Sequence, residues 1–354
     1  MVYASLPDWI RMDPLELLQE FVSIPGPPGQ EEAIRAAVAA HVARLGLTST
    51  EDAKGNLLVK LGEGDPQILV TAHLDEIAMI TRSVRPDGRL SVTSLGGLFP
   101  WKLGEGPVQI LARSGPLDGV LSFGSIHTAF AGSTVRQATS SGLEWEMTEV
   151  ITGLSDSDLY MAGVRPGTRV VVHPSRRQLH RFGSLVSGYF LDDRADLVSW
   201  LLAIDALKDA GICALFAATA AEEVGGEGAL FVMNGKGPFD VCIALELSPV
   251  VEDAMIDLSD QPAVWVTDSY STMAGADLDL ISEVAEECKI HLQYQALSRG
   301  GSDASCAASH GLCGRPFTLG LPIDNSHGYE VMHPGSMKNL ANLTVRLIHR
   351  LSGH

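Results

Sequence analysis

Short, almost wholly apolar segments recur along this sequence and are separated by stretches with helical periodicity. Examples are ILVTA at 68–72, CALFAATAA at 213–221 and VCIAL at 241–245. Strands that are apolar throughout are buried on both faces, which is the arrangement of a sheet covered by helices on both sides. The pattern therefore predicts an α/β fold with a mixed central sheet flanked by helices.

The individual elements follow from the same periodicities and from the glycine and proline residues that end them. The predicted strands lie at 56–61, 67–72, 212–219, 240–247 and 316–321. The predicted helices are two within 14–46, separated by SIPGPPGQ, and others at 194–209, 227–234, 276–288 and from Pro334 onward.

The sequence changes in character between about residues 80 and 179. Glycine and proline recur there, and short β-type runs such as VQILAR and TRVVVH are separated by turn residues, without long helical periodicity. We therefore predict one α/β domain formed by 1–79 and 180–354, interrupted by a β-rich domain at 80–179.

The composition excludes several classes of function. The chain of 354 residues has a formal net charge of −18, whereas nucleic-acid binding needs clustered basic residues. No run of about 18 uncharged apolar residues is present, so we expect no membrane span. The five cysteines show no CxxC spacing, which argues against a disulfide framework and predicts a cytoplasmic location.

Polar residues follow the apolar strands at the point where each strand ends. In open α/β sheets, ligands bind beyond the carboxyl ends of the strands, so these residues are expected to converge on one crevice. Each residue alone has an ordinary alternative, as a core histidine, a helix cap or a solvated strand end, but their joint occurrence is harder to dismiss. The residues are His73, Asp75, Asp192, Asp193, Glu222, Glu223, Glu246 and His327.

Such a set is chemically suited to divalent cations. Imidazole nitrogens and carboxylate oxygens together form a ligand set for Zn²⁺, Co²⁺ or Mn²⁺. Without a cation, so many carboxylates in one crevice would repel one another and take up protons. Their number favours two metal ions over one, and a two-metal site can activate a shared water for hydrolysis.

Four motifs in this order resemble the glutamyl-aminopeptidase and tetrahedral-aminopeptidase family of dinuclear metallopeptidases, some members of which carry an endoglucanase label. The motifs are TAHLDEI, YFLDDRAD, TAAEEVGGEGA and LPIDNSHG. The resemblance spans nearly the whole chain. It implies a metal-dependent aminopeptidase that removes N-terminal residues from peptides.

The family pattern implies a role for each matching residue. His73 and His327 would each bind one of two metal ions, Zn²⁺ or Co²⁺ with Mn²⁺ as an alternative, and Asp192 would bridge both. Glu223 and Glu246 would supply the remaining carboxylate ligands.

The resemblance also assigns two residues that do not bind metal. Glu222 would be the general base that takes a proton from a bridging water, and Asp75 would hydrogen-bond the far nitrogen of His73. Side chains of neighbours in an extended chain point to opposite faces, so Glu223 can bind metal while Glu222 stays free.

The chain departs from the family pattern in three places. Glu246 stands where many relatives have aspartate, Ala78 replaces a glycine, and Asp324 with Asn325 replaces an arginine–tyrosine pair. None of these changes removes an implied metal ligand, so we expect an active site.

The resemblance further implies that residues 80–179 form a PDZ-like β-barrel used for assembly. Relatives build dimers and tetrahedral dodecamers, so a homo-oligomer is expected. His127 matches a histidine that in relatives can reach a neighbouring subunit's active site, although a surface loop histidine is the equal alternative.

Other functions remain open. An amidase, deacylase or carboxypeptidase would use the same metal chemistry on a different part of the substrate. A glycosidase would use paired carboxylates, but it gives no reason for His73 and His327. A binding or scaffold protein could keep the fold without catalysis.

Overall fold

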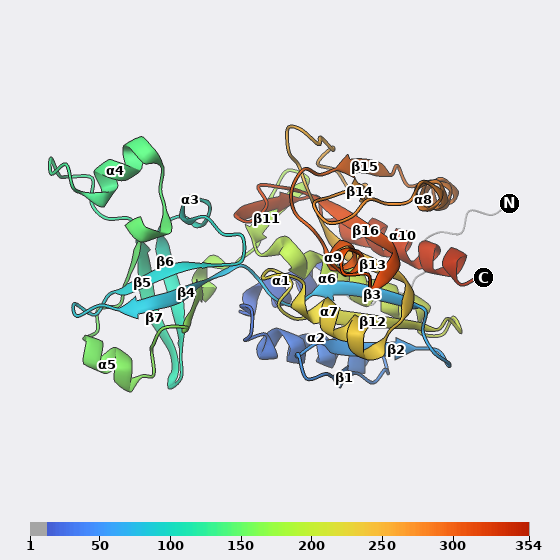
Figure 1. Ribbon diagram of the computed structural model, residues 1–354, viewed down its shortest axis with the longest axis horizontal. Helices are drawn as coiled ribbons and strands as arrows, with labels where there is room; N and C mark the ends of the chain where they lie inside the picture. Colours follow the sequence, from blue (N-terminus) through green and yellow to red (C-terminus); the bar gives the residue numbers. More distant parts are fainter. Residues whose placement is uncertain (1–12, 354) are drawn as a thin grey trace.

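The computed structural model describes residues 13–353. The parts of the predicted α/β domain at residues 1–12 and at residue 354 lie outside the described residues. Two bodies stand side by side, a large α/β domain and a smaller barrel, joined by a narrow waist (Figure 1). Among the helices of the described chain, none has the length and apolar character needed to cross a membrane.

The α/β domain is built on an 11-stranded mixed sheet, and four parallel strands form its centre. The strands β3 and β12 are buried along their whole length, as the apolar runs predicted. The outer strands on both sides of this centre pair antiparallel. A further strand, β14, pairs antiparallel with β16, and β15 pairs parallel with β14. The central strands are β12 (Ala214–Thr219), β3 (Ile68–His73), β13 (Phe239–Pro249) and β16 (Cys313–Asp324).

Outer strands complete the sheet on both sides of this centre. The order is β1-β2-β12-β3-β13-β16-β17-β11-β10, with β14 pairing β16 and β15 pairing β14. The outer strands are β1 (Thr50–Glu51), β2 (Leu57–Leu61), β10 (His180–Phe182), β11 (Leu185–Tyr189), β14 (Ala263–Thr267), β15 (Gln293–Ala296) and β17 (Tyr329–Met332).

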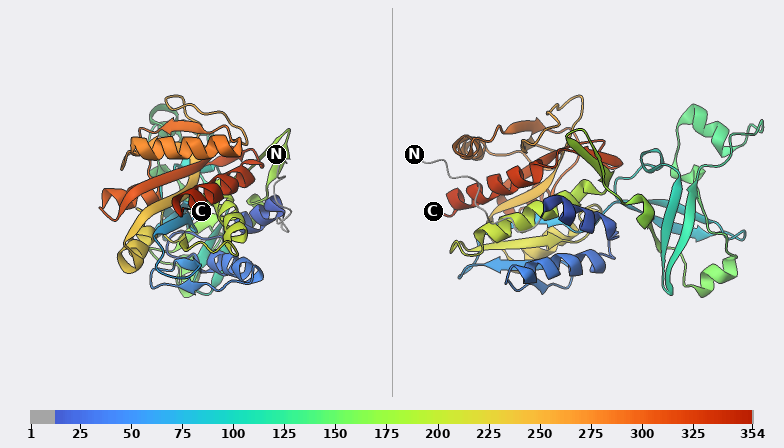
Figure 2. Two further views of the ribbon diagram at one scale, coloured as in Figure 1. Left: turned by 90° about the vertical axis from the view of Figure 1, so that its right-hand side faces the viewer. Right: turned by 180° about the vertical axis from the view of Figure 1, so that it is seen from behind.

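Helices cover both faces of this sheet, as Figure 2 shows. Neighbouring strand residues belong to different cores: Val70 lies in the core that includes residues of α1, α2, α6, α8 and α10, whereas Leu69 lies in the core that includes residues of α7 and α9. The helices are α1 (Pro14–Ser23), α2 (Glu32–Arg44), α6 (Leu191–Leu207), α7 (Glu227–Lys236), α8 (Gly275–Cys288), α9 (Asp303–Ser309) and α10 (Ser336–Leu351). The predicted fold class is confirmed.

The inserted segment folds as a closed antiparallel barrel with the strand order β4-β5-β8-β7-β6-β9. It has its own apolar core, to which Val92, Ile110 and Val170 contribute. Its strands run from residue 78 to residue 172, whereas the insertion was predicted at residues 80–179. The strands are β4 (Ala78–Val84), β5 (Leu90–Leu95), β6 (Gly106–Ala112), β7 (Gly115–Ser122), β8 (Glu149–Ile151) and β9 (Arg169–Val172).

Short helices fill the connections of the barrel and its return to the sheet. The helix α3 lies on the side of the barrel that faces the α/β domain (Figure 1). These elements are α3 (Pro100–Leu103), α4 (Thr134–Ser141), α5 (Asp156–Met161), and the 3₁₀ turns η1 (Trp145–Met147) and η2 (Pro174–Arg176).

The chain crosses between the two domains twice, and a buried ion cluster ties the crossings together. Glu76, just after β3, accepts hydrogen bonds from both terminal guanidinium nitrogens of Arg177, one of them at 2.9 Å. Its Oε2 also accepts from Arg194 at 3.0 Å, and all three side chains are fully buried. Arg177 also lies 4.4 Å from the centroid of the Phe190 ring.

We expect Glu76→Gln to destabilise the protein strongly. The substitution leaves two buried guanidinium groups without their carboxylate, and breaking a buried pair in this way costs about 3–5 kcal/mol of the free energy of unfolding. The matched control is Glu146→Gln, because Glu146 pairs with Arg82 at the surface, where such pairs contribute about 1 kcal/mol or less. Denaturant unfolding of both variants checks this, and equal midpoint shifts would contradict it.

Candidate metal centre

The polar residues that end the strands meet at the carboxyl edge of the parallel strands. His73 is the last residue of β3, and Glu246 lies in β13 near its end. Asp192 lies at the start of α6, where regular helical geometry begins only after Asp193. His327 lies in the connection from β16 to β17. The structure thus brings residues from widely separated parts of the sequence to one place.

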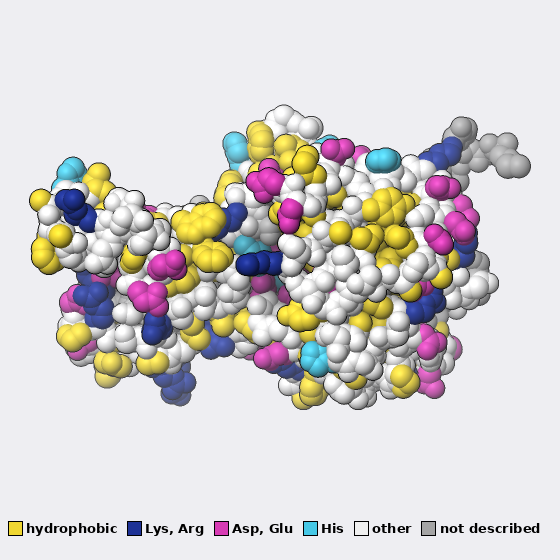
Figure 3. All heavy atoms as spheres, turned by 45° about the horizontal axis from the view of Figure 1, so that its top comes forward, with side chains coloured by type: hydrophobic (Ala, Val, Ile, Leu, Met, Phe, Trp, Pro, Cys, Tyr) yellow, Lys and Arg dark blue, Asp and Glu magenta, His cyan; other side chains and the backbone are white. Residues whose placement is uncertain are grey.

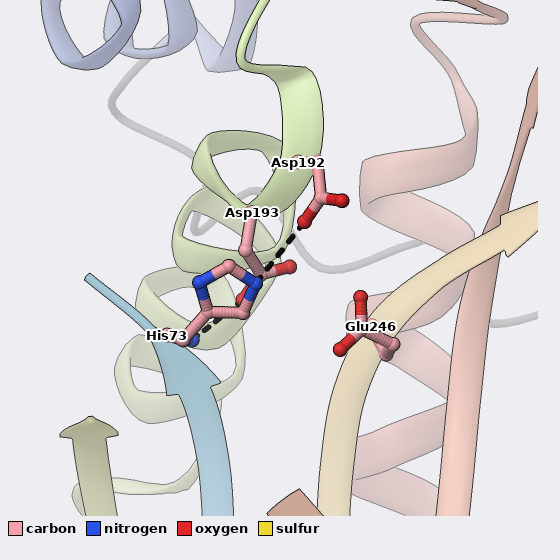
Figure 4. Close-up of side chains that lie close together, drawn as sticks. All are labelled: His73, Asp192, Asp193 and Glu246. Atoms are coloured by element: carbon pink, nitrogen blue, oxygen red, sulfur yellow. Dashed lines mark hydrogen bonds and ion pairs between the residues drawn. The ribbon is translucent and has the colours of Figure 1, made fainter. Parts of the chain in front are cut away.

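One group of candidate ligands consists of His73, Asp192, Asp193 and Glu246. One ligand atom from each lies within 4.8 Å of the others, and Figure 4 shows the four side chains converging. The His73 Nε2 atom is 3.1 Å from Asp192 Oδ1. The backbone N–H of His73 donates to Asp193 Oδ2 at 2.6 Å.

A second group consists of Asp192, Glu223 and His327. The His327 Nε2 atom lies 3.4 Å from Asp192 Oδ2 and 3.8 Å from Glu223 Oε2. Asp192 therefore belongs to both groups, with Oδ1 facing one histidine and Oδ2 facing the other. A carboxylate placed in this way can contact two cations at once.

Asp193 was not among the residues predicted to bind metal, although the sequence signal was present in the Asp-Asp pair. Its carboxylate is fully buried, and its Oδ2 is engaged by the backbone of His73. Its Oδ1 has no hydrogen-bond partner among the described residues. The same is true of both carboxylate oxygens of Asp196, one helical turn further on.

Burial of so many carboxyl groups has a clear electrostatic effect. Burial raises the pKa of Glu223 to about 7 and that of Asp196 to about 7. It also raises the pKa values of Glu222 and Glu246 well above their usual range. Burial acts in the same direction on Asp192, but hydrogen bonds from His327 and His73 outweigh it and lower the pKa of that carboxyl.

These observations fit divalent cations at the edge of the sheet. Glu223 Oε1 is buried and has no hydrogen-bond partner within residues 13–353, which is costly unless a further group neutralises it. Mixed imidazole and carboxylate donors match the preferences of Zn²⁺ and related ions. A positive charge would also favour the ionised state of the surrounding carboxyl groups.

Asp75 lies beside His73, and its carboxylate also binds the loop that carries the two glutamates. The His73 Nδ1 atom is 3.1 Å from the backbone oxygen of Asp75 and 3.5 Å from its Oδ1. The two carboxylate oxygens accept from the backbone N–H groups of Glu222 and Glu223, at 2.9 and 3.1 Å. Asp75 therefore ties the position of His73 to that of both glutamates.

Glu222 and Glu223 differ in their surroundings for a reason other than strand alternation. The strand β12 ends at Thr219, Ala221 has a positive φ of 56°, and both glutamates lie in the turn that follows. Glu223 faces His327, whereas the Glu222 carboxyl has no hydrogen-bond partner among the described residues. The expectation that an extended chain separates the two side chains is therefore wrong, since the turn separates them.

A cavity of about 560 Å³ opens in front of these residues. The candidate ligands and Glu222 line one part of it, and apolar side chains including Leu247, Trp265 and Leu297 line another. The space-filling view shows a hollow between the two domains, with charged and histidine side chains around it (Figure 3). The cavity is large enough to admit the end of a peptide.

His127 lies outside this site. It is exposed in the connection between β7 and α4, on the barrel, and it does not line the cavity. Its neighbours Ile126 and Phe130 are 75% and 72% exposed. Within one chain, the structure does not bring His127 to the other predicted site residues.

The chain is similar to known aminopeptidases over most of its length. The chain is 25% identical to lysyl aminopeptidase of Pyrococcus furiosus, over 95% of this chain and 97% of that protein. It is 22% identical to glutamyl aminopeptidase of Lactococcus lactis, over 84% of each protein.

A solved structure of the TET1 peptidase of Pyrococcus horikoshii superposes with a TM-score of 0.83 and 27% identity, covering 95% of this chain and 99% of that one. A Thermotoga maritima structure described as an endoglucanase shares the fold alone, with a TM-score of 0.69 and 19% identity over 95% of this chain and 97% of that one.

The sequence also matches a family description over most of its length. Residues 55–343 match the family described as M42 glutamyl aminopeptidase. The resemblance stated from the motifs is therefore confirmed, as is the prediction of a peptide hydrolase. This chain belongs to the M42 glutamyl aminopeptidase family.

Proposed function

We propose that this protein is a metal-dependent aminopeptidase that removes N-terminal residues from peptides at a two-metal site. The observation that carries the proposal is the placement of Asp192, whose two carboxylate oxygens face two different histidines. His73, Asp192 and Glu246 would hold one ion; His327, Asp192 and Glu223 would hold the other. Asp193, the fourth member of the first group, adds a buried carboxylate next to the first ion.

The metal pair, either Zn²⁺ or Co²⁺ with Mn²⁺ as an alternative, would activate the attacking water and polarise the substrate carbonyl. The protein's own contribution is to hold the ligands rigidly. Asp75 anchors the Glu222 and Glu223 backbone, and Glu330 accepts from the backbone N–H of Asp192 at 3.1 Å. Such supporting hydrogen bonds orient metal ligands and preserve their affinity.

Glu222 is the residue best placed to act as general base. It lines the cavity beside the candidate ligands, and no described residue hydrogen-bonds its carboxyl group, which leaves it available to water and substrate. Its backbone is fixed by Asp75 at 2.9 Å. In this role the Glu222 carboxylate accepts a proton from the attacking water and donates it to the leaving amine.

Assembly into a homo-oligomer is also part of the proposal. A structure of a relative with a TM-score of 0.84 and 27% identity, over 95% of this chain and 99% of that one, is described as a dodecamer. Pyrococcus horikoshii TET1 is described as assembling into a tetrahedron or an octahedral shell. The barrel carries exposed apolar side chains suited to such contacts, including Ile126 and Phe130.

We assign residues 80–179 to assembly, and residues 1–79 and 180–354 to catalysis, with a dimer building up to a dodecamer. We also propose that His127, which is exposed on the barrel beside Ile126, reaches the active site of a neighbouring subunit. The cytoplasmic location stays a prediction that rests on the cysteine usage.

The two neighbouring glutamates give a sharp test of the mechanism. We expect Glu222→Gln to keep the metal content of the wild type but to lose turnover by about 10²–10⁴-fold, because only the proton acceptor is removed. The matched variant Glu223→Gln should instead bind metal more weakly, since it removes a ligand. Elemental analysis and steady-state kinetics on both variants separate the roles. A metal-loaded Glu222→Gln variant with wild-type turnover would contradict the assignment of the base.

A substrate panel tests which end of the substrate is recognised. We expect hydrolysis of dipeptides with a free amino group, whether or not the carboxyl end is amidated, and no hydrolysis of the N-acetylated forms. The carboxylate-rich site attracts the substrate's ammonium group, and acetylation removes that charge. Activity should disappear after chelation and return with Zn²⁺, Co²⁺ or Mn²⁺.

Other outcomes of the same panel identify the alternatives. Preferred cleavage of acetylated substrates would indicate a deacylase, a requirement for a free carboxyl end would indicate a carboxypeptidase, and cleavage of simple amides alone would indicate an amidase. Release of reducing sugar that is insensitive to chelation would indicate a glycosidase.

A further inference from the structure

We propose that the inserted barrel is part of the metal site and not only a surface for assembly. Its segment 96–103, which leads into and includes α3, would hold His327 in the orientation needed to bind a cation. The proposal rests on the proposed function in one respect, namely that His327 is a metal ligand.

The first contact fixes the imidazole ring. The His327 Nδ1 atom is 2.9 Å from the backbone oxygen of Gly97, so Nδ1 carries the proton and donates it to this carbonyl. The opposite nitrogen, Nε2, faces Asp192 and Glu223, so it is the nitrogen that would bind a cation there. Metal-binding histidines are commonly oriented in this way by a carbonyl on the far side of the ring.

The barrel segment approaches the site so closely that a larger residue would crowd it. A Cβ atom on Gly97 would lie 3.0 Å from Cε1 and Nδ1 of His327. A Cβ atom on Gly96 would lie 3.3 Å from Cβ of Glu223, and Gly96 also has a positive φ of 90°. Two consecutive glycines therefore allow the barrel backbone to lie directly against two candidate ligands.

The second contact involves Lys102 in α3. Its Nζ atom donates to Asn325 Oδ1 at 2.6 Å and to the backbone oxygen of Asn325 at 3.2 Å. Asn325 is one of the residues by which the sequence departs from the family pattern, and it lies two positions before His327. The unusual residue therefore receives a partner from the barrel, across 223 residues of sequence.

The connection that carries His327 needs such support because its backbone is strained. Asn325 and His327 both have positive φ values, 60° and 59°, a region that residues with a side chain seldom adopt. The Asn325 side chain donates to the backbone oxygen of Tyr329 at 2.8 Å. The bond from Lys102 thus holds the outer end of a strained turn.

The α/β domain holds the other side of the same residue. The backbone N–H of His327 donates to Glu330 Oε1 at 3.0 Å, while Glu330 Oε2 accepts from the backbone of Asp192 at 3.1 Å. Glu330 therefore links two candidate ligands from within the catalytic domain, and Gly97 and Lys102 hold His327 from the barrel. A shift of the barrel would break only the bonds that involve Gly97 and Lys102, and it would leave those to Glu330 intact.

The test uses the full-length protein, with the Co²⁺ ion as the probe. We expect Lys102→Met to lower the affinity for one of two Co²⁺ ions by about 10-fold, the lower end of the effects seen for groups that orient metal ligands, and to change the visible absorption of bound Co²⁺. Lys102→Arg, which can still donate to Asn325, should restore both properties. The control is Lys60→Met, at an exposed position in β2.

Two further variants examine the same contacts from the other side. Asn325→Gly removes the accepting side chain and tolerates the positive φ, so combining it with Lys102→Met should add little to the loss caused by either change alone. Gly97→Ala should weaken Co²⁺ binding through its contact with the His327 ring. Gly235→Ala is its control, since a Cβ there meets no atom within 4 Å.

The possible outcomes separate this inference from the proposed function. Wild-type protein that binds no metal would overturn the proposed function itself. Wild-type protein that binds two Co²⁺ ions, together with folded Lys102→Met and Gly97→Ala variants of unchanged affinity and spectrum, would overturn the role of the barrel alone. Loss of one ion in these variants, with rescue by Lys102→Arg, supports it.

Discussion

The main physical constraint on this structure is the mutual repulsion of carboxylates that are buried together at one edge of the sheet. Asp192, Asp193, Glu223 and Glu246 cannot all be ionised in this position without positive charge beside them, and burial raises the pKa of Glu223 to about 7. The fold nevertheless supports them, because the backbone N–H groups of His73 and Leu247 donate to Asp193 and Glu246, and the His73 imidazole pairs with Asp192. Bound cations would replace the repulsion between the carboxylates with attraction to the cations, and this attraction would stabilise the arrangement of the site.

Much of the α/β domain could be predicted from the sequence because its central strands are apolar throughout. The segments that became β3, β12 and β13 show this pattern directly. The strands β14 (Ala263–Thr267) and β15 (Gln293–Ala296) were not predicted, since they are short and β15 alternates buried with exposed residues in a stretch of mixed polarity. The AVWV run of β14 is a strand signal that the prediction missed, and the alternation in β15 covers only four residues.

In the candidate site, the sequence predicted the residues that lie at the ends of apolar strands, but not the contacts between distant segments. His73 and Glu246 could be placed because each ends or closely follows an apolar run. The bonds from Asp75 to two backbone N–H groups span 147 and 148 residues, and the contact of Gly97 with His327 spans 230. Such contacts depend on how distant segments pack, which no local pattern records.

The buried ion cluster of Glu76, Arg177 and Arg194 has a consequence for how the α/β domain forms. It holds the two ends of the inserted segment next to each other. His73 and Asp192 lie on opposite sides of that insertion, so a disordered insertion would impose the closure entropy of a long loop on their meeting. Once the barrel has folded with its ends together, the same two halves are joined as if by a short connection. Folding of the barrel thus lowers the entropy cost of bringing together the two chain segments that flank it.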